Sequence, residues 1–175
     1  MYKLLKGYSG FTLIELLVTI TVASILMGIA IPSFNSIIQS NRLTTRANEL
    51  VSALNFARSE AIKRNLRISL CKSSAGIVCT TSNDWSQGWI IFTDDNNNSI
   101  YDSTDTLLKV QSNLANTITM VADTTIANSI SYLTTGLINQ IGTIKICDER
   151  KGNVGIVLDI NSVGRVSTTT KQLCT

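Results

Sequence analysis

The longest apolar stretch of the chain is Phe11–Ile31, which contains one ionisable residue, Glu15. A helix of about 20 apolar residues spans the hydrocarbon core of a bilayer. Lys3 and Lys6 precede the stretch, so the positive-inside rule places the N-terminus in the cytoplasm and the rest of the chain across the membrane. The stretch is longer than the apolar region of a secretory signal peptide, and no small-residue cleavage site follows it. The pattern therefore predicts a retained membrane-spanning helix.

Apolar residues continue at helical spacing after Pro32. One stripe recurs every three or four positions: Ala47, Leu50, Val51, Leu54, Ala57 and Ala61. Basic residues occupy the other face: Arg42, Arg46, Arg58, Lys63 and Arg64. These patterns predict one long helix from about Thr12 to Arg64, kinked at Pro32. Its first half lies in the membrane, and its amphipathic second half packs on a globular head.

From Leu66 the pattern changes to short runs rich in Val, Ile and Thr, separated by Asn, Ser and Gly. Eight strands are predicted: Leu66–Cys71, Gly88–Thr93, Thr106–Gln111, Thr117–Val121, Ser129–Leu133, Thr143–Cys147, Val154–Ile160 and Gly164–Ser167. No helix separates them, so antiparallel pairing is expected. The fold class is α+β, with a long N-terminal helix packed on an antiparallel β-sheet head whose core includes Trp85 and Trp89.

The expected organisation has three parts. Residues 1–10 form a leader, residues 11–34 the membrane helix, and residues 35–175 the head. Within the head, residues 35–64 are the amphipathic half of the helix and residues 65–175 are β-rich.

Charge and composition exclude several functions. The chain has 15 basic and 12 acidic residues, and 13 basic residues remain after the first ten positions, so the head is nearly neutral. This balance alone does not indicate a nucleic-acid binder. The chain contains no histidine, which excludes imidazole bases, Ser–His triads and histidine metal sites. No carboxylates pair at a recognisable catalytic spacing, so neither an enzyme nor a cofactor is expected.

Glu15 needs a partner. A carboxylate inside the apolar zone costs about 2.5–3.5 kcal/mol unless it is paired. The nearest basic residue, Lys6, lies outside the apolar stretch, so the partner is expected on another chain. Cleavage between Gly10 and Phe11 would create such a cation, the new amine of Phe11 on a neighbouring copy.

The segment Gly10-Phe11-Thr12-Leu13-Ile14-Glu15 resembles the class III signal of type IV pilins and type II secretion pseudopilins. The resemblance implies that a prepilin peptidase cuts after Gly10 and methylates Phe11. It also implies that Glu15 pairs with the N-terminal amine of a neighbour in a filament. The implied partners are other minor and major pilins, the peptidase and the inner-membrane assembly platform.

Four cysteines in an exported head permit disulfides in three pairings. We favour Cys71–Cys79, which closes a short loop, and Cys147–Cys174, which ties the C-terminus to a strand. A Cys₄ zinc site is the alternative, but the sequence lacks a C-x₂-C pair.

The acidic segment 94–105 has the oxygen spacing of a calcium-binding EF-hand loop. Its candidate ligands at positions 1, 3, 5, 9 and 12 are Asp94, Asn96, Asn98, Asp102 and Asp105. Ser99 stands where that loop needs glycine, and Asp105 is shorter than the usual glutamate. A β-hairpin turn is the favoured interpretation, because Asp and Asn tolerate turn conformations.

The head resembles the GspH/FimT family over nearly the whole chain. The resemblance rests on the order of five motifs: Arg58-Ser59-Glu60-Ala61-Ile62, Leu70-Cys71, Trp85-Ser86-Gln87-Gly88-Trp89-Ile90-Ile91-Phe92, Ile146-Cys147-Asp148-Glu149-Arg150 and Gly164-Arg165-Val166. The paired cysteines and the C-terminal Gly-Arg segment are more similar to FimT- and FimU-like minor pilins than to the GspH-like pseudopilin of type II secretion. The resemblance implies a single-pass inner-membrane precursor with a periplasmic head, and then a subunit at or near the pilus tip.

Some FimT-like relatives hold double-stranded DNA through a C-terminal Gly-Arg-x-Arg stretch, and here Ser167 replaces the second arginine. The corresponding DNA-binding candidates are Lys145, Arg150, Lys151, Arg165, Ser167 and Lys171. The alternative is a terminal hairpin whose basic residues are simply solvated.

Overall fold

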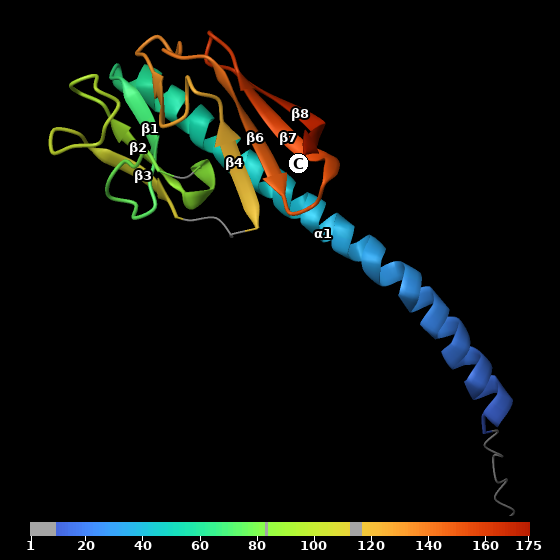
Figure 1. Ribbon diagram of the computed structural model, residues 1–175. Helices are drawn as coiled ribbons and strands as arrows, with labels where there is room; N and C mark the ends of the chain where they lie inside the picture. The colour runs from blue at the N-terminus through green and yellow to red at the C-terminus, as the bar shows by residue number, and fades with distance from the viewer. Residues whose placement is uncertain (1–9, 83, 113–116) are drawn as a thin grey trace, which may run out of the picture. The chain divides into compact units, whose positions relative to one another are not determined.

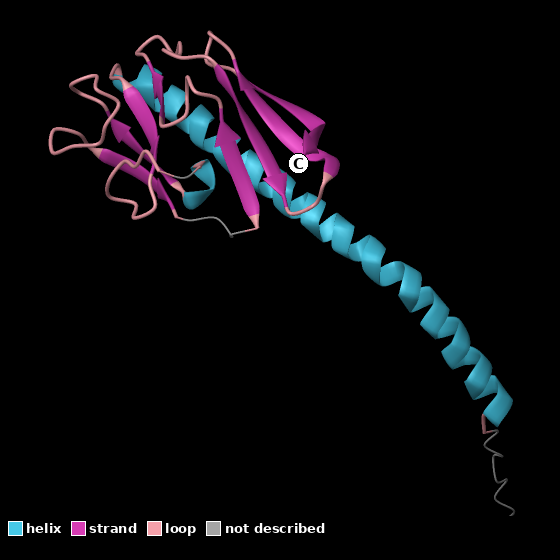
Figure 2. Cartoon of the chain, in the orientation of Figure 1, coloured by secondary structure: helices cyan, strands magenta, loops and turns pink. Residues whose placement is uncertain are grey.

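The computed structural model describes residues 10–82, 84–112 and 117–175. The elements, in chain order, are a long helix, eight strands and one short 3₁₀ helix: α1 (Leu13–Arg64), β1 (Ile68–Lys72), η1 (Trp85–Gln87), β2 (Trp89–Thr93), β3 (Leu107–Gln111), β4 (Ile118–Ala122), β5 (Ser129–Tyr132), β6 (Gly142–Asp148), β7 (Gly152–Ile160) and β8 (Val166–Cys174). Figure 2 shows the segregation of helix and strands that the α+β prediction requires, and that prediction is confirmed.

The structure divides into two units, residues 1–39 and residues 40–175. In the first unit, the described part of α1 exposes its apolar side chains. The helix is long and apolar enough to cross a membrane, with a mean hydropathy of 2.3 over its most apolar window. The predicted leader lies outside the described residues, except for Gly10.

In the second unit, α1 supplies one side of the core. Its buried face carries small and aliphatic residues at helical spacing: Leu43, Ala47, Leu50, Ala53, Leu54, Ala57 and Ala61. Five of the six residues of the predicted stripe are buried, and Val51 is half-buried against the same core. Alanines in this stripe let the backbone of α1 approach the strands closely, so a thin layer of side chains fills the space between them.

The strands form two antiparallel sheets, with the orders β3-β2-β1-β5 and β4-β6-β7-β8. All eight predicted strands are present, but the division into two sheets was not predicted. One core cluster joins residues of α1 with residues of both sheets, and α1 runs behind both sheets in Figure 1. The buried Trp85 and Trp89 belong to this core, as predicted.

The last strand is longer than the sequence indicated. The prediction ended it at Ser167, whereas β8 extends to Cys174 and pairs with β7 from Val166 onward. Threonines and a lysine occupy its middle, so it lacks the apolar alternation that marks a strand. Its pairing with β7, not its own sequence pattern, defines its length.

Both favoured disulfides are present, Cys71–Cys79 and Cys147–Cys174. The second links β6 to β8 and passes over β7 at Gly155, which lies between these two strands in the sheet. A Cβ atom at position 155 would lie 2.7 Å from Cys174 Sγ and 3.2 Å from Cys147 Sγ. Glycine is therefore required for the disulfide to cross the strand.

Removing the two disulfides is expected to have unequal effects on stability. Their sequence separations are 27 and 8 residues, and the entropy that a crosslink removes from the unfolded chain grows with the loop it closes. Replacing Cys147 and Cys174 with serine should lower the free energy of unfolding by about 3.5 kcal/mol, and the same change at Cys71 and Cys79 by about 2.5 kcal/mol. Urea titration of the two double variants of the head checks the order, and the reverse order would contradict it.

Candidate functional site

The N-terminal motif opens the helix with a cap. Thr12 directly precedes α1, its Oγ1 accepts a hydrogen bond from the backbone N–H of Glu15 at 3.3 Å, and its carbonyl accepts one from Leu16 at 3.2 Å. A Thr three residues before a Glu is the sequence signature of a capping box. This role was not predicted, although Thr12 and Glu15 stand at the spacing that signals it. Thr12 thus fixes where α1 begins, at Leu13, two residues after Phe11.

Gly10, Phe11 and Glu15 are all exposed in the structure. An alanine-sized side chain at Gly10 would meet no atom within 4 Å. Glu15 lies in the first turn of α1, where the helix dipole favours a negative charge. Among the described residues Glu15 forms no ion pair, and its pairing with a neighbour's amine stays a prediction.

The six DNA-binding candidates are not brought together in one patch. Arg150 and Lys151 precede β7, whereas Arg165 follows its other end. Nine residues of extended strand separate the two ends by roughly 25–30 Å. Lys145 lies between them on β6, paired with Val157.

Arg150 is already engaged within the head. Its Nη2 lies 2.7 Å from Asp148 Oδ2, its Nε donates to both oxygens of the same carboxylate, and its Nη1 donates to Ser40 Oγ at 3.0 Å. This arrangement fastens the β6–β7 turn to α1 and neutralises the charge of Arg150. A phosphate would have to compete with the carboxylate for the same donors.

The remaining candidates also lie in different surroundings. Ser167, on the edge strand β8, pairs in register with the exposed Asp159 of β7, which adds a negative charge beside it. Lys171 lies at an irregularity of the β7–β8 pairing with a φ of 59°, and it lines a groove with Ser40 and Thr44 of α1. Exposed Arg165 is in the β7–β8 turn, where its backbone N–H donates to Asn161 Oδ1 at 3.0 Å.

The turn that carries Arg165 packs against the C-terminal part of α1. Arg58 Nε donates to the carbonyl of Gly136 at 3.0 Å, and a Cβ at Gly164 would lie 2.6 Å from that carbonyl oxygen. Gly164 also adopts a φ of 72°, in the left-handed region. Burial raises the pKa of Tyr132, beside Gly164, to about 12, so its hydroxyl stays protonated and can donate to the Gly164 carbonyl. The Gly-Arg motif therefore has a structural role in which glycine is essential.

The five calcium candidates are not arranged as one ligand set among the described residues. Asp94 is buried and its carboxylate is engaged in an ion pair with Arg67. Asp102 accepts hydrogen bonds from the side-chain N–H groups of Asn96 and Asn98, so the amides present nitrogen to the carboxylate. Hydrogen bonds from Thr104 first, and then from these two amides, hold the pKa of Asp102 well below its usual range. Among the described residues, no cluster of three or more Cys, Asp or Glu side chains is placed to hold a metal ion.

This loop is instead held as a turn by internal hydrogen bonds. Asp105 accepts from the backbone N–H groups of Asp95 and Asp102, and Asn98 Oδ1 accepts from the N–H of Ile100. The favoured interpretation, a turn between two paired strands, agrees with the antiparallel pairing of β2 and β3 on either side of it.

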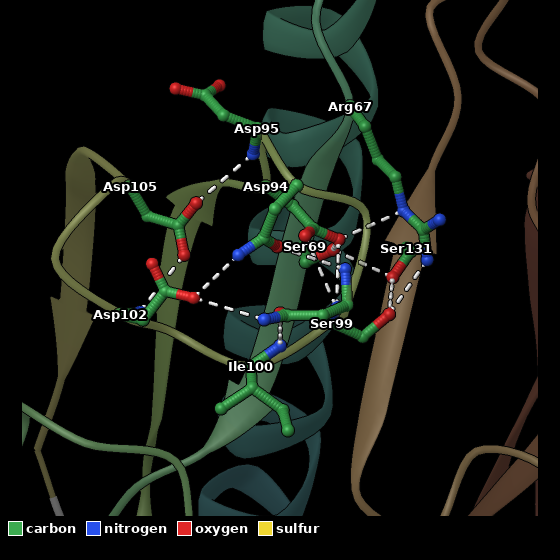
Figure 3. A network of polar contacts seen from close by, with 11 residues as sticks. Arg67, Ser69, Asp94, Asp95, Ser99, Ile100, Asp102, Asp105 and Ser131 are labelled. Atoms are coloured by element: carbon green, nitrogen blue, oxygen red, sulfur yellow. Dashed lines mark hydrogen bonds and ion pairs between the residues drawn. The ribbon is translucent and has the colours of Figure 1, made fainter.

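A buried polar network under this loop was not anticipated (Figure 3). Arg67 Nε lies 3.0 Å from Asp94 Oδ2, and Arg67 Nη2 donates to Ser99 Oγ at 2.7 Å. Ser69 donates to the same Asp94 oxygen at 2.7 Å and shares a hydrogen bond with Ser131. The network joins β1, β5 and the loop after β2, and it closes the end of the first sheet. Its buried carboxylate has both an ion-pair partner and hydrogen-bond donors, as a buried charge requires.

Comparisons with known proteins give two family matches. The model of the family described as type II transport protein GspH matches residues 46–164, which is more than half of the chain. The model described as prokaryotic N-terminal methylation motif matches residues 5–31. No curated protein gives a significant match to the chain.

Solved structures with the same fold include the type IV minor pilin FimU of Pseudomonas aeruginosa strain PAO1 in two crystal forms. The first shares 23% sequence identity with a TM-score of 0.60, and covers 79% of this chain and 99% of that chain. The second shares 24% sequence identity, has a TM-score of 0.57, and covers 75% of this chain and 99% of that chain. This likeness is one of fold. Because the GspH model spans most of the head and the methylation motif precedes it, the chain belongs to the GspH family of pilin-like proteins with an N-terminal methylation motif.

Proposed function

We propose that the protein is a minor pilin of a type IV pilus. In this proposal the precursor is inserted through residues 11–34 with residues 1–10 inside the cell and the head, residues 35–175, in the periplasm. The prepilin peptidase cuts after Gly10 and methylates Phe11, and the assembly platform then moves the subunit into the complex that starts the filament and stays near its tip.

One observation carries this proposal: the methylation motif over residues 5–31 leads into α1, which continues to Arg64 and forms part of the head core. A removable signal needs no such continuity. A filament subunit needs a continuous helix, because the packing of the membrane half in the filament has to fix the position of the head. The exposed apolar side chains of the first unit supply surface that other pilin helices can cover.

Glu15 sets the register of assembly in this proposal. Apolar packing between helices tolerates sliding, whereas a carboxylate in the apolar zone is neutralised at one depth, beside the amine of a neighbour's Phe11. The first-turn position of Glu15, four residues after the new N-terminus, suits such a contact between staggered copies.

A pseudopilin of a type II secretion system is the second candidate, and the description of the matching family favours it. Two measurements in the native host separate the candidates. We expect a deletion strain to lose pilus-dependent motility and keep enzyme secretion, and mass spectrometry of sheared pili to find this chain beginning at N-methylated Phe11. Loss of secretion with normal motility would favour the pseudopilin. An unprocessed chain, still carrying residues 1–10, would contradict both candidates.

The geometry favours assembly over DNA binding. Contacts between basic side chains and phosphates supply most of the non-specific affinity for DNA. Their contributions to the affinity add up when the basic residues line one surface. Here Arg150 is neutralised by Asp148, Ser167 faces Asp159, and Arg165 lies a strand length away from Lys151.

We therefore expect the soluble head to give no band shift with duplex DNA at physiological ionic strength, whatever the DNA sequence. Arg165→Ala should behave like the parent head. A salt-sensitive shift that Arg165→Ala abolishes would overturn this prediction and make DNA capture part of the function.

A further inference from the structure

Two loops of the first sheet expose aliphatic side chains close to one another, because the loop after β2 touches the disulfide-closed loop after β1. Ile77 and Val78 come from the loop between β1 and η1, Ile100 from the loop between β2 and β3, and Val110 from β3. Their exposed fractions are 71%, 52%, 56% and 43%. We name these four residues the loop patch. Exposed aliphatic residues are common when they are scattered, and they are informative when they gather on one rigid surface.

Two contacts bring these segments together. The backbone N–H of Tyr101, next to Ile100, donates to Cys79 Sγ, next to Val78, at 3.2 Å. An added Cβ at Gly76, next to Ile77, would lie 2.8 Å from Val110 Cγ1, so this turn touches β3 directly. The loop that carries Ile77 and Val78 is therefore in contact with both the loop that carries Ile100 and the strand that carries Val110.

A second small core lies beneath the loop patch. It contains Cys71, Ile90 and Phe92, with Cys79 and Tyr101 packed against it, and the rings of Phe92 and Tyr101 lie 5.4 Å apart. The Cys71–Cys79 disulfide closes the first loop over this core. The loop patch is thus presented by crosslinked, packed loops, and binding would cost little ordering entropy.

The rim of the loop patch is acidic. The loop after β2 carries Asp95, Asp102 and Asp105, and no lysine or arginine occurs between Thr93 and Leu108. The loop from residue 73 to residue 80 has no charged residue at all. Asp95 is exposed, and its carboxylate points away from the buried network in Figure 3. This field repels nucleic acid and anionic lipid, and it attracts a basic surface.

We infer that the loop patch docks the head of a different pilin-like subunit, whose contact surface presents aliphatic residues beside lysines or arginines. This inference rests on the proposed function, because a subunit of a filament has other heads beside it. A twofold contact with a second copy is disfavoured, since it would bring the three aspartates of both copies together. Aliphatic residues on the rigid loops supply the buried centre of the contact, and the aspartates select the partner.

The test uses the full chain in its native host, with the photocrosslinking amino acid benzoylphenylalanine at Val78. Filaments are sheared from irradiated cells, and any adduct is identified by mass spectrometry. Ile77→Ser and Asp95→Lys are then added singly. Asp95→Lys keeps the backbone N–H that bonds Asp105. Ile141→Ser is the matched control, because Ile141 is 58% exposed and lies outside the loop patch, just before β6.

We expect an adduct with another pilin-like subunit, reduced at least about fivefold by Ile77→Ser and by Asp95→Lys and unchanged by Ile141→Ser. An adduct with a second copy of this chain would overturn the inference. So would the absence of any adduct while the chain is present in the filaments, and in both of these cases the proposed function would stand. If the chain is absent from sheared filaments, the proposed function fails and the inference fails with it.

Discussion

Replacing Glu15 with glutamine is expected to remove the protein from pilus filaments while the leader is still cut and the head still folds. In the filament, the amine of a neighbour's Phe11 would lose its carboxylate partner, and breaking one side of a buried pair costs about 3 kcal/mol or more. That energy corresponds to a loss of about a hundredfold in the assembled fraction. Immunoblots of sheared filaments against whole cells measure the loss, and mass spectrometry of the N-terminus checks processing.

Glutamine is the informative substitution because it keeps the helix-capping role of residue 15 and removes only the charge. Glutamine serves as well as glutamate at the third helical residue of a capping box, so α1 still begins after Thr12. Thr12→Ala is the matched control, since it removes the oxygen that accepts the Glu15 N–H and leaves the carboxylate in place. Loss of a cap costs about 1 kcal/mol at the start of the helix. Thr12→Ala should therefore assemble far better than Glu15→Gln, and equal defects would show that helix capping, not charge pairing, is what assembly requires.

Most of the fold could be predicted from the sequence because its signals are local. The 3.6-residue period after Pro32 gave the helix to Arg64, and runs of Val, Ile and Thr gave eight strands at nearly their final positions. The strands divide into two sheets because β5 pairs with β1, about 60 residues earlier, and no local pattern carries that information. The end of β8 was missed for the same reason, since its pairing with β7 replaces the missing apolar alternation.

Distance along the sequence is a poor guide to distance in space in this head. Lys151 and Arg165 lie 14 positions apart in the chain, and β7 lies between them as an extended strand. Conversely, Arg67 and Asp94 are 27 positions apart and form a buried pair. They become neighbours because β1 begins where β2 ends, with Ile68 opposite Thr93. The processing motif could be recognised without knowledge of strand pairing, because all of its residues lie within one segment.

Replacing Arg67 with alanine is expected to be the most destabilising single change in the polar part of the head. The Asp94 side chain is fully buried, and Arg67, 13% exposed, is its ion-pair partner at 3.0 Å. Without the guanidinium, Ser69 and the N–H of Ser99 remain as hydrogen-bond donors, but no positive charge faces the buried carboxylate in the network. Leaving a buried charge unpaired costs about 3–5 kcal/mol, whereas an exposed pair contributes at most about 1 kcal/mol.

Arg46 provides the control for this prediction. Its guanidinium lies 2.8 Å from Glu49, a distance similar to that of the buried pair, but both side chains are about 30% exposed. Urea unfolding of the head should give a loss of about 3 kcal/mol for Arg67→Ala and less than about 1 kcal/mol for Arg46→Ala. Arg67→Lys should fall between them, because lysine restores the charge without the planar fork that reaches both Asp94 and Ser99. Similar losses for the two alanine variants would mean that Asp94 is solvated in solution, and the network would then be an ordinary surface cluster that does not fix the loop above it.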